Sequence, residues 1–89
     1  MTRTELETRL IADTMDTDID SVEEYLSALG DTRECDEGIA DGIDDEDCED
    51  EYVMYRSYDL NANGKRFHII FSYGNNTRDI ADIVVREED

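Results

Sequence analysis

Few side chains in the sequence can support covalent or metal chemistry: one histidine, His68, and two cysteines, Cys35 and Cys48. A nucleophilic triad needs a cysteine or serine beside the histidine and an acid that orients the ring. No spacing in the sequence indicates such an arrangement. A structural zinc site of Cys and His residues needs four ligands, and this chain offers three. We therefore expect no catalytic residues, no metal site and no cofactor.

The two cysteines leave two states open. A cytosolic chain keeps its thiols reduced, which favours two free thiols. A disulfide between Cys35 and Cys48 would close a loop of about 14 residues and add roughly 3 kcal/mol in the chain-entropy description. Such a bond would also clip the acidic residues between the cysteines into a compact loop.

An Asp-rich stretch could be a calcium-binding loop, because Ca²⁺ is bound by carboxylate oxygens. An EF-hand loop needs oxygen ligands at positions 1, 3 and 5, a glycine at position 6 and a glutamate at position 12. In a loop that starts at Asp36, positions 3 and 5 are Gly38 and Ala40. In a loop that starts at Asp41, position 3 is Ile43 and position 6 is Glu46. Neither register provides a calcium loop.

The charge of the chain is its dominant property. Its 89 residues include 26 acidic and 8 basic side chains, for a formal net charge of −18. Such a chain repels nucleic acid and anionic membranes, so direct binding to either is excluded. The longest apolar run covers residues 69–71, and the first residues lack the apolar core of a signal peptide. We expect one domain over residues 1–89, located in the cytoplasm.

Residues 1–30 are expected to form two helices. Thr4 and Glu7 fit a capping box, and Leu6, Leu10, Ile11 and Met15 make one apolar stripe. Residues 16–18 break the helix, and either Asp18 or Asp20 caps the next. The stripe of this second helix consists of Val22, Tyr25, Leu26 and Leu29, and Gly30 is expected to end it in a left-handed conformation.

Residues 31–51 form the most acidic segment, with twelve acidic side chains and only Arg33 as a base. Seven of the eight positions from Asp44 to Glu51 are acidic. Such a block repels itself and tends to stay extended unless a partner neutralises it. Ile39 and Ile43 are spaced to anchor a turn of helix. An acidic loop or a short helix is therefore expected here.

Residues 52–89 are rich in strand-forming side chains and nearly neutral, with six acidic and five basic residues. Residues 61–64 and 74–76 are expected turns, since Asn and Gly tolerate positive φ. In the last strand Ala81, Ile83 and Val85 are expected on one face. The sequence predicts a three-stranded antiparallel meander. Packing the N-terminal helical hairpin on this sheet gives a two-layer α+β domain.

The acidic array is the strongest functional signal. Carboxylates at i, i+3 and i+4 on a helix have Cβ atoms roughly 5–6 Å apart, close to the spacing of successive phosphates along a strand of nucleic acid. Asp13, Asp16 and Asp20 are expected in such a row, followed by Glu23 and Glu24. The predicted partner-binding residues are Asp20, Glu23, Glu24, Asp36, Glu37, Asp41, Asp44, Asp45, Glu46, Asp47, Glu49, Asp50 and Glu51. Tyr52, Tyr55 and Tyr58 can add contact area at the rim or pack within the sheet.

In size, charge and helix-plus-meander layout, the chain resembles the small acidic phage proteins that mimic DNA, of the anti-CRISPR and anti-restriction type. The resemblance rests on residues 36–51 and the acidic helix faces, since this class shares no sequence motif. It implies an inhibitor without catalytic activity that blocks the DNA- or RNA-binding groove of a host defence nuclease. The implied partner is a basic nucleic-acid-binding protein, such as a CRISPR-Cas or restriction nuclease.

Two alternative functions would also explain the excess of acidic residues. A halophilic protein would also be rich in Asp and Thr and poor in Lys, and this chain has one lysine, Lys65, against seven arginines. Its acids would then hold hydration in high salt. The uneven charge argues against this reading, because salt adaptation acidifies every exposed face. The second alternative is an antitoxin-like or chaperone-like binder of another basic protein.

Overall fold

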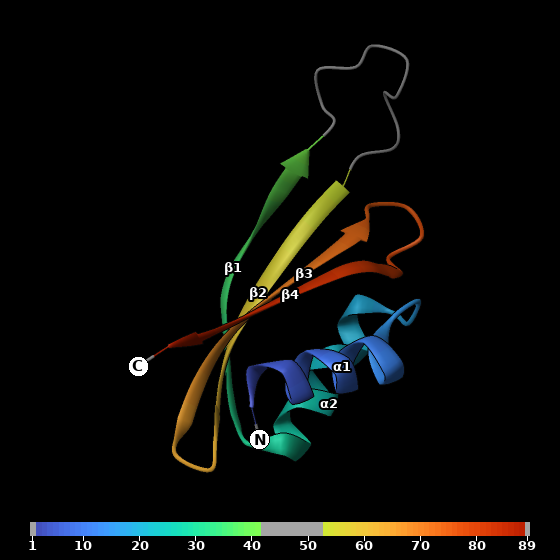
Figure 1. Cartoon of the computed structure of the whole chain (residues 1–89). Coiled ribbons are helices and arrows are strands. Elements are labelled where there is room, and N and C mark those ends of the chain that lie inside the picture. Colours follow the sequence, from blue (N-terminus) through green and yellow to red (C-terminus); the bar gives the residue numbers. More distant parts are fainter. Residues whose placement is uncertain (1, 42–52, 89) are drawn as a thin grey trace.

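A computed structural model describes residues 2–41 and 53–88 and shows helices packed on one face of an antiparallel sheet (Figure 1). The helical elements are α1 (Arg3–Thr14), the 3-10 helix η1 (Ile19–Ser21) and α2 (Val22–Leu29). The strands are β1 (Asp31–Asp41), β2 (Val53–Ala62), β3 (Lys65–Gly74) and β4 (Ile80–Glu88), in the spatial order β1-β2-β3-β4. None of the described helices has the length and apolarity needed to span a bilayer.

The α+β class fits, but the three-stranded meander is wrong, because the sheet has a fourth strand. Residues 31–41 form β1, an edge strand that pairs antiparallel with β2, and neither an acidic loop nor a helical turn at Ile39. An edge position makes this possible, since most side chains of β1 reach solvent and the pairing with β2 satisfies its backbone. A register shift between Glu34 and Asp36 places Cys35 in a bulge.

The helices begin and end differently from the prediction. Thr2 and Glu5 form the capping box of α1, two residues before the expected Thr4 and Glu7. Glu7 instead pairs with Arg3 at 2.8 Å. Asp18 caps η1, and α2 follows directly at Val22. Leu6, Leu10, Val22 and Leu26 are fully buried as the stripes predict, whereas Ile11 is exposed.

The connection between α1 and η1 is tied to the start of β4. Asp16 has a φ of 64°, which ends α1 and turns the chain toward the sheet. The Asp16 amide donates to the Ile80 carbonyl at 3.0 Å, and the Ile80 amide donates to Thr17 at 2.9 Å. The break predicted at residues 16–18 is confirmed. It is also a fixed link between the two layers.

The hydrophobic core lies between the helices and one face of the sheet. It contains Leu6, Leu10, Ile19, Val22, Leu26, Tyr58, Leu60, Ala62, Phe67, Ile69, Phe71, Tyr73, Ile80, Ile83 and Val85. Tyr58 is therefore a core residue. Of the two roles considered for it, packing within the fold is the one the structure shows, and not a place at a binding rim. In β4 the core-facing residue is Ile80 and not Ala81, because the register shifts by one between Ser72 and Tyr73.

Gly30 is required by the fold, but not for the expected left-handed turn. Its φ of 173° is extended backbone that any residue adopts. A Cβ at this position would lie 2.1 Å from the Asn61 carbonyl oxygen, in the adjacent backbone of β2. Glycine is thus needed for the close approach of α2 to the sheet. The left-handed glycine is Gly64, which with Asn63 forms the tight β2–β3 turn.

No described helix covers the second face of the sheet, which we call the outer face. Its side chains include Tyr55, Asp59, His68, Ile70 and Val84, as the alternation with the buried residues of β2, β3 and β4 requires. His68 lies opposite Phe67 and Ile69, as predicted.

Candidate functional site

The negative charge of the described residues collects at one end of the fold. This acidic end comprises residues 13–24, 34–41, 53–58 and 70–82, and it holds twelve acidic residues against two arginines. The hairpin end comprises residues 2–12, 25–33, 59–69 and 83–88, and it holds six acidic and six basic residues. The entire net charge of −10 on the described residues therefore belongs to the acidic end.

This segregation differs from the predicted one. The sequence places the excess in the N-terminal half and a nearly neutral sheet in the C-terminal half. In the fold, the second half of β1, the start of α2 and the β3–β4 turn lie toward the same end of the strands (Figure 1). The charge thus follows the long axis of the strands and not the division between helices and sheet.

Both arginines of the acidic end are held in internal contacts. Arg56, on the helix side of β2, is only 14% exposed and contacts Glu37 at 2.6 Å. The same guanidinium lies 3.2 Å from Asp20 and 3.5 Å from Glu34. Its burial alone would lower the pKa of Arg56, but hydrogen bonds to Tyr58 and Glu37 raise it overall. Arg56 therefore remains a fixed cation that joins η1 to β1.

Arg78 completes this network from the β3–β4 turn. It contacts Asp20 at 3.0 Å, and its guanidinium carbon lies 5.7 Å from the centroid of the Tyr73 ring. Arg56 lies 5.8 Å from the same ring. The hydrogen bond from Arg78 holds the pKa of Asp20 below its usual value, with Arg56 as the second cause. A hydrogen bond from Arg56 likewise lowers the pKa of Glu37.

Two of the predicted partner-binding residues, Asp20 and Glu37, are therefore engaged within the protein. Asp36 accepts a hydrogen bond from the Tyr55 hydroxyl at 2.9 Å and remains exposed. Asp41 lies at the end of β1, opposite Val53. The predicted residues Asp44, Asp45, Glu46, Asp47, Glu49, Asp50 and Glu51, together with Ile43, Cys48 and Tyr52, lie outside the described residues.

Glu23 and Glu24 are the predicted residues that the fold presents most openly. Both are exposed in the first turn of α2, and neither forms an ion pair with another described residue. They do not continue a single helical row with Asp13 and Asp16, because α1 ends at Thr14 and Asp16 leaves the helix. The predicted row is thus replaced by an array from three segments.

The array as a whole is a set of exposed carboxylates around a rigid centre. Beyond the internally paired groups, the acidic end presents Asp16, Asp18, Glu23, Glu24, Asp36, Asp79 and Asp82, all exposed. Asp18 and Asp79 face each other in an isolated bridge between the α1–η1 connection and the start of β4. Clustered carboxylates of one sign attract a cationic surface and steer its approach. The arrangement suits the binding of a cationic surface.

Sequence reasoning missed three residues of interest. Arg56, Arg78 and Asp59 carry no local signal, because their partners lie 36, 58 and 9 positions away in the chain. Strand pairing brings Asp59 to His68, and the packing of η1 against the sheet brings Asp20 to Arg56 and Arg78. No family model matches the chain, and neither the curated proteins nor the solved structures yield a match.

Proposed function

We propose that this protein is a nucleic-acid mimic that inhibits a nucleic-acid-binding enzyme by occupying its basic groove. The enzyme class that suits it is a phage-defence nuclease, of the CRISPR-Cas or restriction type. The observation that carries the proposal is the segregation of charge, with twelve acidic residues against two arginines at one end and an even balance at the other.

The two arginines of the acidic end give the mimic its rigidity. Because Arg56 and Arg78 are held by Asp20, Glu34 and Glu37, they do not screen the outward carboxylates from a partner. Holding Asp20 and Glu37 in place also fixes the start of α2 against β1 and the β3–β4 turn. A pre-arranged array loses less conformational freedom on binding than a flexible chain of the same charge. Asp20 and Glu37 are therefore positioning residues, and the exposed carboxylates contact the partner.

The even balance of the hairpin end favours mimicry over adaptation to salt. A hydration coat for high salt would acidify all exposed surfaces, including the outer face of β3 and β4. Arg66, His68 and Arg86 lie on that face beside Glu88. Concentrated charge at one end is instead what a ligand for a cationic groove requires.

The proposal is tested by displacement of labelled duplex DNA from purified phage-defence nucleases, followed by fluorescence anisotropy. We expect the protein to release the DNA from its target at a one-to-one ratio. Between 50 and 200 mM salt its affinity should fall by about a hundredfold or more, because several ionic contacts are lost together. A cooperative melt at both salt concentrations is the control for folding.

Three results would count against the mimic. Inactivation of the nuclease by substoichiometric protein would indicate an enzyme. A complex in which the labelled DNA stays bound would show that the groove is not the site. Failure to melt cooperatively at 50 mM salt would favour the halophilic alternative.

A further inference from the structure

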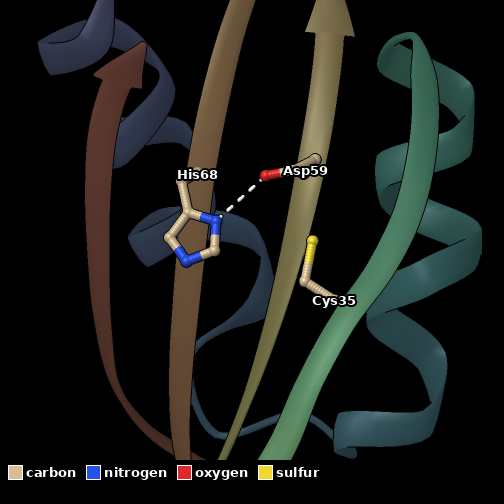
Figure 2. Close-up of side chains that lie close together, drawn as sticks. All are labelled: Cys35, Asp59 and His68. Carbon is tan, nitrogen blue, oxygen red and sulfur yellow. Dashed lines mark hydrogen bonds and ion pairs between the residues drawn. The ribbon is translucent and has the colours of Figure 1, made fainter.

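Three side chains capable of binding a metal ion converge on the outer face, where residue 35 of the acidic end meets residues 59 and 68 of the hairpin end. Cys35 of β1, Asp59 of β2 and His68 of β3 lie on adjacent strands and point toward one another (Figure 2). Their ligand atoms all lie within 4.8 Å of one another. The His68 Nδ1 atom lies 2.9 Å from Asp59 Oδ1. Glu88 Oε1 lies 3.7 Å from the same nitrogen.

The strand register explains the convergence. Asp59 and His68 are direct partners in the β2–β3 ladder. Arg33 is the partner of Asp59 on β1, and the bulge that follows Glu34 turns Cys35 to the same face. One extra residue in β1 therefore adds a sulfur to a carboxylate–imidazole pair. A bulge that re-aims a side chain is a recurrent feature of functional sites.

The order of contacts does not suit nucleophilic catalysis. Asp59 lies between the thiol and the imidazole, whereas a triad places the imidazole between the nucleophile and the acid. Burial, followed by contact with Asp59, raises the pKa of the Cys35 thiol. The thiol is thus protonated at neutral pH and is not activated by its surroundings.

We propose that Cys35, Asp59 and His68 bind Zn²⁺, with Glu88 as the fourth ligand. Thiolate, imidazole and carboxylate are the three ligand types that zinc takes in proteins. A tetrahedral ion holds such atoms roughly 3.3–3.7 Å apart, so modest side-chain rotations close the site around the ion. On binding, the Cys35 thiol releases its proton to solvent. Two carboxylates and one thiolate then give an anionic site, and sulfur and nitrogen favour Zn²⁺ over Ca²⁺ or Mg²⁺.

The neighbouring Arg33 fits this assignment. Arg33 lies 3.6 Å from Asp59 Oδ2, and His68 contacts the other oxygen, Oδ1. One carboxylate oxygen can therefore bind the ion while Arg33 orients the other, as outer groups do in zinc sites.

The site would fasten the edge strand to the centre of the sheet. Cys35 is the only one of the three principal ligands on β1, which pairs with β2 alone. A metal shared by β1, β2 and β3 adds a link that the hydrogen-bond ladder lacks. This inference stands independently of the proposed mimicry, because none of its residues belongs to the exposed carboxylate array.

The test is a Co²⁺ titration of the full chain under reducing conditions, with Zn²⁺ as competitor. We expect a thiolate-to-Co²⁺ charge-transfer band that reaches one ion per chain and that Zn²⁺ removes. Cys35→Ser should abolish the band. Asp59→Asn and His68→Asn should each weaken binding by about a hundredfold or more. Cys48→Ser and Asp82→Asn, which keep all four ligands, should leave the band unchanged.

A second measurement uses stability. A hundredfold excess of Zn²⁺ over its Kd should raise the Tm of the unaltered chain by on the order of 10 °C, and should leave Cys35→Ser unchanged. Loss of the band in Cys48→Ser with retention in Cys35→Ser would overturn the assignment. Equal metal affinity in all variants would also overturn it, since it would show binding spread over the carboxylates.

Discussion

Replacing Glu23 and Glu24 together with lysine is expected to weaken binding to the target groove by about a hundredfold or more. Both side chains are exposed in the first turn of α2 and form no ion pair with another described residue. Each reversal removes an attraction and sets a cation against the lysines and arginines of the groove, a juxtaposition that costs several kcal/mol. The measurement is the Kd of the purified complex at 100 mM salt.

The matched control is Asp31→Lys combined with Glu87→Lys. It changes the net charge by the same amount but at the hairpin end, where acidic and basic residues balance. The account predicts little change in Kd for this pair. An equal loss in both double variants would mean that overall charge, and not its placement, drives binding. Melting curves of both proteins distinguish a loss of binding from a loss of stability. This control is needed because lysine in the first turn of a helix also opposes the helix dipole.

Replacing Arg56 with methionine is expected to destabilise the fold by about 2 kcal/mol, which lowers the Tm by roughly 10 °C. The arginine side chain is only 14% exposed, and its removal leaves Glu34 and Glu37 without their shared cation. The stacking of the guanidinium on Tyr73 is lost as well. Urea denaturation of both proteins at pH 7 measures the difference. Arg33→Met is the control, because Arg33 is 82% exposed and contacts Asp59 at 3.6 Å.

The pH dependence of this difference identifies its cause. Contacts with arginine lower the pKa of Glu37 from 4.5 and that of Asp20 from 3.8. A carboxylate whose pKa is lowered on folding stabilises the protein above its unfolded pKa and loses this contribution as the pH falls through the folded value. The gap in unfolding free energy between the unaltered protein and Arg56→Met should therefore be full above about pH 5 and narrow below about pH 4. If this difference in unfolding free energy did not change with pH, the lost stability would come from packing and not from charge.

The sequence predicted the parts of the fold that local patterns determine. The apolar stripes located both helices, the short polar residues located the break after α1, and Asn and Gly located the hairpin turns. The missing strand, β1, has no such pattern. Its acidic residues disfavour a strand in isolation, and only pairing with β2 and an edge position make them tolerable. Pairing between distant segments overrode local preference at that point.

The candidate site was likewise predicted only in part. Sequence reasoning identified the excess of acid and the exposed pair Glu23 and Glu24. It could not separate outward carboxylates from Asp20 and Glu37, because their arginine partners come from β2 and the β3–β4 turn. It also counted only Cys and His as zinc ligands and so missed Asp59, which the register places beside His68.

Hydrogen–deuterium exchange of the protein, free and bound to its target nuclease, tests the central claim most directly. The account predicts that binding slows exchange at the acidic end, in η1, the first turn of α2 and the β3–β4 turn. The β2–β3 hairpin and the end of β4 should exchange as in the free protein. Protection confined to the hairpin end, with unchanged exchange around Glu23 and Glu24, would contradict the account.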